Sequence, residues 1–152
     1  MQILWSRPPD KDDMSGKGAE LAGGRWNSIG QAMFYTAENR ALCTAEIAVH
    51  TPLGIVPKNY YLISIEIPQD TDMLEIDVKD LPKNWKTFPH SPITKKVCDQ
   101  FIAQNNFLIM KVPSAVIHGA YNCLINPTHK NFKKVNIVGS EPFAFDKRLF
   151  DK

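Results

Sequence analysis

Short strand-type segments recur along the chain, and only two helical segments interrupt them, an order that strongly restricts the possible folds. Residues 60–67 (YYLISIEI) and 73–78 (MLEIDV) alternate apolar and polar side chains, as half-buried strands do. Residues 38–50 and 92–105 instead carry apolar side chains at helical spacing. Strands interrupted by two unevenly placed helices favour a compact α+β fold, with mixed sheets and few helices, over a doubly wound sheet.

Several further segments are predicted to be strands. Residues 2–7 (QILWSR) are β-prone and end at two successive prolines, through which neither a strand nor a helix continues. The alternating segments 60–67 and 73–78 are expected to pair in a meander of two or three strands. The remaining predicted strands cover residues 32–36, 107–112, 120–125 and 134–138.

Residues 10–30 are polar and rich in glycine, which predicts a long loop after the first strand. The five glycines, at positions 16, 18, 23, 24 and 30, allow the backbone to approach another group closely. Long loops in small domains are often functional. This loop is therefore a candidate functional segment.

The first predicted helix places an acidic residue near its apolar face. Thr36 is the candidate N-cap. Leu42, Ala45 and Val49 form one stripe at about 100° per residue, and Glu46 lies within roughly 70° of its centre. Glu46 is therefore expected at the edge of the core.

The composition fits one globular domain over residues 1–152, with 43% hydrophobic and 22% charged residues. The formal charge of +2 is too small to imply a nucleic-acid or anionic-membrane partner. No apolar run approaches the roughly 20 residues of a membrane helix. The start MQILWSRPPD has a charge and two prolines where a signal peptide is apolar, so a cytoplasmic protein is expected.

The cysteines and histidines lack the spacing of metal ligands. Cys43, Cys98 and Cys123 are odd in number, far apart and without a CxxC pair, so neither a disulfide framework nor a zinc site is indicated. The four histidines likewise lack ligand spacing with one another or with a cysteine. Buried free thiols and no metal site are expected.

The segment GGRWN (23–27) is the first candidate for chemistry, because two glycines leave space beside an arginine. The planar guanidinium of Arg25 can bind a phosphate through two hydrogen bonds. The alternative is a surface loop in which Trp26 fills the core and Arg25 is solvated. The segment is neither a GxGxxG motif nor a P-loop, so it does not indicate ATP hydrolysis.

Glu46 and Ser114 are the other candidates. An acidic side chain beside an apolar stripe is costly unless it is paired or used, so Glu46 is either catalytic or held in a salt bridge, for instance to Arg7 or Arg25. Ser114 follows Pro113 in a turn after a strand, where its hydroxyl either faces a cleft or caps the turn. No GxSxG elbow surrounds it, which weakens a serine-hydrolase interpretation.

Together these motifs resemble the RES domain, a family named for its Arg, Glu and Ser. The matching segments are WSR, GGRWNSIG with Gly18 upstream, FYTAENRALCTAEIAVH, VPSAV, YNCLINPTH and FAFDKRLF. They run from Trp5 to Phe150 in the family's order and cover nearly the whole chain. ITKKVCDQFI departs from the pattern, since it lacks the glycine and tryptophan often found there. This departure bears on packing or partner contacts more than on the cleft.

The resemblance implies the toxin of a bacterial toxin–antitoxin pair, with a fold similar to ADP-ribosyltransferases and with NAD as its substrate rather than a cofactor. The residues implied to be catalytic are Glu46, Arg25, Tyr35 and Ser114. The residues implied to bind NAD are Arg7, Arg25, Trp26, Asn27, Tyr35, Ser114 and Asn126. Asn122 is a neighbour within the same motifs and has no assigned role.

Cleavage of the nicotinamide–ribose bond is the expected reaction. Nicotinamide leaves as a neutral molecule, so one carboxylate suffices where an ordinary glycosidase uses two. Glu46 suits the role of stabilising the developing oxocarbenium charge on ribose. Water or inorganic phosphate as acceptor gives hydrolysis or phosphorolysis. A protein acceptor gives ADP-ribosyl transfer at the same site, and the sequence leaves these alternatives open.

The resemblance also implies a cognate antitoxin with a helix-turn-helix domain and leaves a homodimer within the complex open. Neither a membrane nor direct contact with nucleic acid is expected. An alternative function of a different class is that of an RNA-binding or RNA-cleaving toxin. It would use the basic and aromatic cluster Lys130, Phe132, Lys133 and Lys134. Such charge runs are usually solvated faces.

Overall fold

One mixed β-sheet organises the molecule. The computed structural model describes residues 1–6, 8–9 and 14–151, and within these ranges seven strands follow the order β4-β5-β6-β2-β1-β3-β7. The strands are β1 (Gln2–Trp5), β2 (Phe34–Ala37), β3 (Tyr60–Glu66), β4 (Met73–Glu75), β5 (Ile109–Pro113), β6 (Tyr121–Ile125) and β7 (Asn136–Phe143). β4 pairs parallel with β5, whereas β1 pairs antiparallel with both β2 and β3. The predicted α+β class with a mixed sheet is confirmed.

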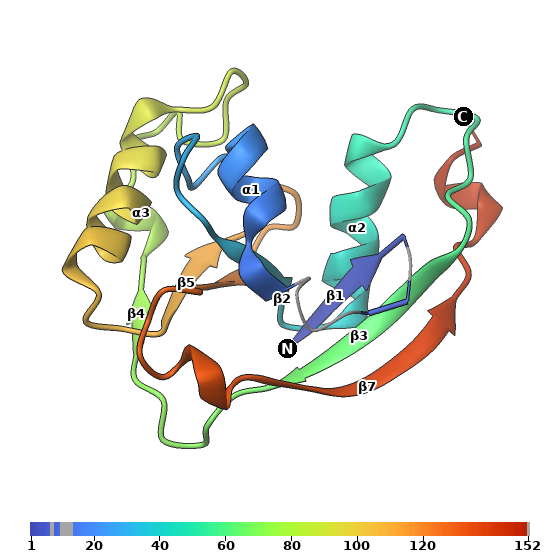
Figure 1. Cartoon of the computed structure of the whole chain (residues 1–152). Helices are drawn as coiled ribbons and strands as arrows, with labels where there is room; N and C mark the ends of the chain where they lie inside the picture. The colour runs from blue at the N-terminus through green and yellow to red at the C-terminus, as the bar shows by residue number, and fades with distance from the viewer. Residues whose placement is uncertain (7, 10–13, 152) are drawn as a thin grey trace.

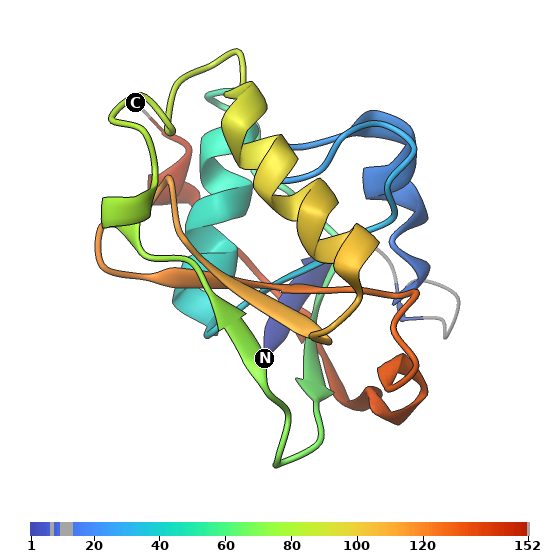
Figure 2. The same cartoon turned by 90° about the vertical axis from the view of Figure 1, so that its left-hand side faces the viewer.

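The α-helices of the described residues are α1 (Lys17–Ala22), α2 (Arg40–His50) and α3 (Pro92–Gln104). Short 3-10 turns cover Val78–Asp80, Phe132–Lys134 and Lys147–Leu149. The views in Figures 1 and 2 place α1, α2 and α3 on the same side of the sheet. α1 and α3 lie toward the β4–β5 end, and α2 lies toward β1 and β3.

The predicted meander is wrong. β4 lies at one edge of the sheet and β3 lies near the other, so the two consecutive strands are not neighbours. Helix α3 instead connects β4 to β5, and a parallel pair requires such a long crossover. The alternation of apolar and polar residues identifies a strand and its buried face, but it does not determine which other strand pairs with it.

The segment predicted to be a long loop contains the helix α1, which the sequence patterns do not indicate. Gly16 precedes α1 with φ 72° and Gly23 follows it with φ 67°, so both ends use a conformation that glycine adopts readily. None of the six residues of α1 is buried. An apolar stripe, the usual signal of a short helix, is therefore missing from this segment.

The two predicted helices are confirmed, with one corrected cap. Ser91 caps α3 and Pro92 occupies its first position, a typical helix start. Asn39 caps α2 by accepting a 3.0 Å hydrogen bond from the backbone of Leu42, so the predicted cap Thr36 is wrong. Thr36 lies in β2, where its hydroxyl donates to the Cys123 carbonyl at 2.7 Å.

The apolar stripe predicted for α2 also needs correction. Leu42 is buried as expected, but Val49 is 57% exposed, and Cys43 takes its place in the packed face. Glu46 follows Cys43 by three residues, so both side chains lie on the face of α2 that is turned toward the sheet. Glu46 is half-buried.

Two apolar clusters cover the helix side of the sheet. The cluster below α3 contains Trp26, Met33, Trp85, Cys98, Phe101, Met110, Val112 and Leu124. The cluster below α2 contains Leu4, Ala37, Leu42, Cys43, Leu62, Phe145 and Phe150. A third cluster lies on the opposite face and contains Phe34, Ile63, Ile65, Leu108, Ile109, Cys123, Ile125 and Val135. The boundary between the first two clusters runs over the middle of the sheet.

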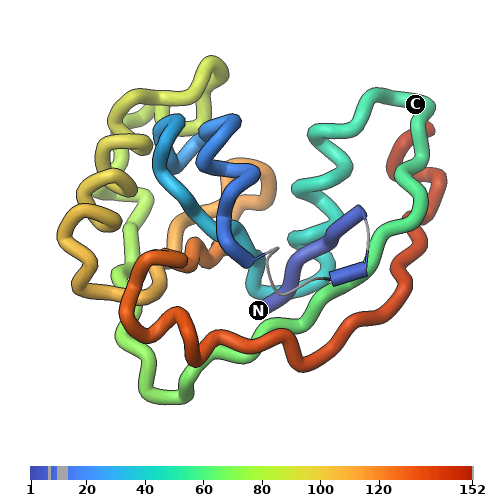
Figure 3. Tube along the Cα trace, viewed as in Figure 1, coloured from blue at the N-terminus to red at the C-terminus, as the bar shows by residue number. Residues whose placement is uncertain are grey.

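The C-terminal segment lies beside the loop after α2, as Figure 3 shows. The backbone N–H of Gly54 donates to the Phe150 carbonyl at 2.8 Å, which closes this end of the molecule. The predicted buried free thiols are confirmed. Among the described helices, none is long and apolar enough to cross a membrane.

Candidate functional site

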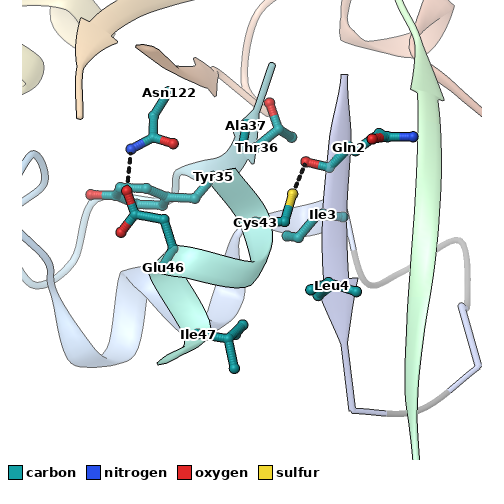
Figure 4. Close-up of a pocket in the computed structure, with 10 residues that line it drawn as sticks. All are labelled: Gln2, Ile3, Leu4, Tyr35, Thr36, Ala37, Cys43, Glu46, Ile47 and Asn122. Carbon is teal, nitrogen blue, oxygen red and sulfur yellow. Dashed lines mark hydrogen bonds between the residues drawn. The ribbon is translucent and has the colours of Figure 1, made fainter. Parts of the chain in front are cut away.

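Three elements bring polar side chains together between the two apolar clusters. Glu46 lies on α2, Asn122 lies on the interior strand β6, and Ser114 follows β5. One carboxylate oxygen of Glu46, Oε1, accepts hydrogen bonds from Asn122 Nδ2 at 2.8 Å and from Ser114 Oγ at 3.1 Å. Figure 4 shows the contact between Asn122 and Glu46. The carboxylate is thus held by two neutral donors.

The strand register explains the position of Asn122. β6 pairs with β2 on one side and with β5 on the other, where Asn122 lies opposite Ala37 and Val112. Both neighbours belong to clusters on the helix side of the sheet, and directly opposed residues point to the same face. The side chain of Asn122 therefore points toward α2.

The alternative of a salt bridge between Glu46 and Arg25 is wrong for the part of the chain described. No ion pair within residues 14–151 joins these two side chains. Arg7, the other candidate partner and an expected NAD ligand, lies outside the described residues.

Ser114 is buried, with 2% of its surface exposed, so of the two alternatives for its hydroxyl the one that opens it to a cleft is wrong. Its Oγ accepts hydrogen bonds from the backbone N–H groups of Val116 at 3.0 Å and Ile117 at 3.1 Å, as in a capping serine. The single hydroxyl proton is then directed at Glu46. A serine used in this way orients a carboxylate and is poorly placed to act as a nucleophile.

Tyr35 connects strand β2 to the glycine-rich segment. Its hydroxyl donates to Asn27 Oδ1 at 2.7 Å and accepts from the backbone N–H of Trp26 at 3.3 Å. Burial raises the pKa of Tyr35, so the phenol stays neutral at physiological pH. Both hydrogen bonds of the hydroxyl are made within the protein, and the aromatic ring of Tyr35 lines the pocket described below.

Arg25 holds the proline-rich loop before α3. Its Nη1 donates to the carbonyls of Trp85 at 2.9 Å and Thr87 at 3.2 Å, so the alternative of a fully solvated arginine is wrong. Trp26 is 3% exposed, and its expected place in the core is confirmed. Burial lowers the pKa of Arg25, while the charge of nearby Glu46 opposes this shift. Arg25 thus provides a positive charge close to the carboxylate.

A mainly apolar pocket of about 210 Å³ opens beside Glu46 (Figure 4). Its lining residues are Gln2, Ile3, Leu4, Tyr35, Thr36, Ala37, Cys43, Glu46, Ile47 and Asn122. The Cys43 thiol donates to the Gln2 carbonyl at 3.3 Å, and burial raises its pKa to about 12. A thiol with this pKa is protonated at neutral pH and is not a nucleophile. Glu46 is the carboxylate among the residues that line the pocket.

Three residues expected to bind NAD have side chains engaged within the protein. Asn27 and Asn126 are fully buried, and Trp26 packs against Trp85 with ring centroids 6.0 Å apart. Asn27 Nδ2 donates to the carbonyls of Ala19 and Gln31 at 2.8 and 2.9 Å. Asn126 Nδ2 donates to the side chain of Asn105, and its Oδ1 accepts from Thr128. These contacts support the segments around the pocket.

The family model of the RES domain matches residues 3–146 of the chain. The chain belongs to the RES family. This RES protein is 33% identical to the "Prs ADP-ribosylating toxin" of Sphingobium sp. over 97% of its own length and 92% of the relative. It is 34% identical to a "Toxin Res" of Photorhabdus laumondii, over 89% of the chain and 86% of that relative.

A solved structure has the same fold. The crystal structure of the M. tuberculosis MbcT–MbcA toxin–antitoxin complex contains a chain with a TM-score of 0.68 to the RES protein. The similarity covers 98% of this chain and 85% of the other, at 18% sequence identity. At this identity the comparison concerns the fold alone.

Asn122 is the site residue to which sequence reasoning assigned no role. The available signal was a polar residue within the strand segment YNCLI, two positions before the buried Leu124 and therefore on the same face. The basic cluster considered for RNA offers a weaker site, because Phe132 packs against the apolar cluster on the far side of the sheet. An aromatic ring in such a packing is not free to stack on a base.

Proposed function

We propose that this RES protein is a toxin that cleaves the bond between nicotinamide and ribose in NAD. The observation that carries the proposal is Glu46, a carboxylate held by Ser114 and Asn122 at the edge of an apolar pocket. Relatives named as toxins over nearly the whole chain length support the biological role. NAD is the substrate, and the reaction requires no cofactor or metal.

The chemistry follows from the charge on the leaving group. The electron pair of the C1′–N bond goes to the pyridinium nitrogen, so nicotinamide departs neutral and needs no general acid. The ribose gains oxocarbenium character, which a fixed carboxylate stabilises in a site of low dielectric. Glu46 supplies that carboxylate, and an acceptor oxygen then forms the new bond to C1′ and loses its proton.

The pocket suits the nicotinamide ring, and the arginines suit the phosphates. Tyr35 presents its ring to the pocket, where it can stack on a flat aromatic group. Arg25 has its Nη1 occupied by two carbonyls and can offer its other nitrogens to the pyrophosphate. We propose Arg7 as a second phosphate ligand. Trp26, Asn27 and Asn126 then support the site from within the protein.

Two classes of acceptor are proposed for the ribose. Water or inorganic phosphate gives free ADP-ribose or its phosphorylated product and drains NAD. A protein side chain gives mono-ADP-ribosylation, and the name "Prs ADP-ribosylating toxin" of a relative with 33% identity favours this second candidate. Both reactions break the same bond and use Glu46 in the same way.

A cognate antitoxin is the proposed partner, because an unrestrained NAD-consuming enzyme would harm its own cell. The fold neighbour is part of a toxin–antitoxin complex, which supports this assignment. We propose that the antitoxin combines a helix-turn-helix domain with a segment that covers the cleft, and that the toxin acts in the cytoplasm.

The test is to incubate the purified protein with NAD, with and without phosphate, and to identify the products. We expect release of nicotinamide, with Glu46→Gln slowing turnover by at least ~100-fold while ADP-ribose still binds. Glu66→Gln, the same change at an exposed position on β3, is the matched control and should keep full turnover. A Glu46→Gln variant with full turnover, or a wild-type protein that leaves NAD intact, would contradict the proposal.

A further inference from the structure

We propose that Asn122 is a positioning residue which, with Ser114, commits one oxygen of the Glu46 carboxylate to the protein and leaves the other for the substrate. This inference rests on the proposed cleavage of NAD. It gives a role to Asn122, which neither the sequence motifs nor the named relatives assign.

The two hydrogen bonds to Oε1 come from parts of the chain far apart in sequence. Asn122 lies 76 residues and Ser114 lies 68 residues from Glu46, and both donate to the same oxygen. An oxygen that accepts two hydrogen bonds has its lone pairs occupied. Oε2 is therefore the oxygen that can face a ribose hydroxyl or the developing charge.

Both donors are fixed by the backbone around them. Asn122 lies in the strand β6, which is paired on both sides, so its Cα cannot shift without breaking the sheet. Ser114 is held by its own N–H, which donates to Ala120 at 2.8 Å, and by the backbone donors on its hydroxyl. The pair therefore sets the rotation of the carboxylate before the substrate arrives.

The amide of Asn122 is also the right chemical group for this position. A carboxylate on α2, packed between two apolar clusters, is costly without donors. An amide N–H provides a donor without adding a compensating positive charge, so the negative charge stays available to the oxocarbenium ion. A lysine at the same position would neutralise that charge.

The test uses Asn122→Asp, which keeps the size of the side chain and removes the donor. In this variant the new carboxylate lies in hydrogen-bonding contact with the Glu46 carboxylate, because Asn122 Nδ2 is 2.8 Å from Oε1. Two carboxylates in contact cannot both ionise without strong repulsion, so the pair shares a proton at low pH. The protonated Asp can then donate to Glu46 as the amide does. We expect kcat to fall roughly 10- to 100-fold at pH 8, to recover as the pH is lowered, and KM to change less than kcat.

Wild type and Asn136→Asp, the same substitution on the exposed side of β7, are the controls and should show no such recovery at low pH. Asn122→Ser is a second variant that shortens the side chain without adding charge, and its kcat should be low at every pH. ADP-ribose binding by calorimetry reports on folding and should persist in both Asn122 variants.

Three results would overturn the inference while leaving the proposed function intact. These are a wild-type kcat in Asn122→Asp, an equal loss of kcat at every pH in that variant, and loss of ADP-ribose binding together with kcat in both variants. If the wild-type protein itself does not release nicotinamide, the proposed function fails first, and the two failures are thereby distinguished.

Discussion

The hydroxyl of Tyr35 donates a 2.7 Å hydrogen bond to the side-chain oxygen of Asn27, which ties the glycine-rich segment to strand β2. The same hydroxyl accepts from the backbone of Trp26 at 3.3 Å. One phenol thus fixes the residues next to Arg25 and also orients the ring that lines the pocket. The site depends on this contact for the relative placement of its positive and aromatic groups.

Gly24 leaves the space that this contact needs, and Gly24→Ala should therefore disrupt it. A Cβ at Gly24 would lie 2.8 Å from the Tyr35 hydroxyl and 2.9 Å from Asn27 Oδ1, both too close. We expect the free energy of unfolding to fall by about 1–3 kcal/mol and NAD turnover to fall with it. Chemical denaturation and a nicotinamide-release assay measure the two effects.

Gly18→Ala is the matched control for that prediction. Gly18 lies in α1, and nothing lies within 4 Å of its added Cβ. Alanine in a helix is more favourable than glycine by roughly 0.5–1 kcal/mol, so this variant should be slightly stabilised and fully active. Equal behaviour of the two variants would show that the space at Gly24 is unimportant.

Arg25→Ala should weaken both the loop before α3 and the binding of ADP-ribose. The carbonyls of Trp85 and Thr87 would lose a charged donor, at a cost of about 1–3 kcal/mol in unfolding free energy. Loss of a charge-assisted phosphate contact should weaken ADP-ribose binding roughly 10- to 100-fold by calorimetry. Arg7→Ala should affect binding in the same direction.

Arg148→Ala is the control for Arg25→Ala. Its side chain is 84% exposed and pairs with Asp146 at the surface. Exposed ion pairs contribute about 0–1 kcal/mol, so both stability and ADP-ribose binding should be nearly unchanged. Unchanged ADP-ribose affinity in Arg25→Ala and Arg7→Ala alike would mean that the pyrophosphate binds elsewhere.

Local patterns predicted the elements that have a strong periodicity of their own. The alternation of residues 60–67 matches β3, and the Ser91 cap with its following proline matches the start of α3. Helix α1 escaped prediction because it buries no residue and depends on Gly16 and Gly23 at its ends. Periodicity cannot indicate a helix that lacks an apolar face.

The site was partly predictable for a different reason. Glu46 was recognisable by its place beside an apolar stripe, which makes an unpaired carboxylate costly. Its partner Asn122 is 76 residues away, and their contact depends on β6 lying between β2 and β5. Strand order of this kind is set by the packing of the whole chain, and no local spacing encodes it.

The buried thiols predict a loss of stability at alkaline pH. Burial raises the pKa of Cys98 to about 12 and that of Cys123 to about 11, from an ordinary value of 9.0. Above pH 9 the unfolded thiols ionise first, so the unfolded state binds fewer protons and the free energy of unfolding falls as pH rises. The loss is at most about 1.4 kcal/mol per pH unit for each thiol.

Urea denaturation between pH 8 and pH 11 measures this slope. Cys98→Ala removes one of the thiols, so its free energy of unfolding should fall less steeply with pH than that of the wild type. At pH 8 this variant should be less stable than the wild type, because a fully buried side chain is truncated. Parallel curves for the two proteins would contradict the assignment of the slope to the thiol.

Inhibition by the proposed antitoxin should be competitive with NAD. A chain end that enters the site needs only to occupy the phosphate position, where its terminal carboxylate can pair with Arg25 or Arg7 as the substrate does. Raising the NAD concentration should therefore restore nicotinamide release by the complex. Arg25→Ala should weaken inhibition together with ADP-ribose binding, because both use the same guanidinium.

Shortening the antitoxin at its inserting end separates inhibition from complex formation. The truncated antitoxin should still copurify with the toxin through the remaining interface, while NAD consumption returns toward the rate of the free enzyme. Truncation at the opposite end is the control and should leave inhibition intact. If the antitoxin blocks the phosphate position, NAD cannot bind with its nicotinamide ribose at Glu46, and the full-length complex should not consume NAD. Two results would therefore exclude occlusion of the Arg25 site. One is a full-length complex that consumes NAD as fast as the free enzyme, and the other is an antitoxin that protects cells solely by binding DNA.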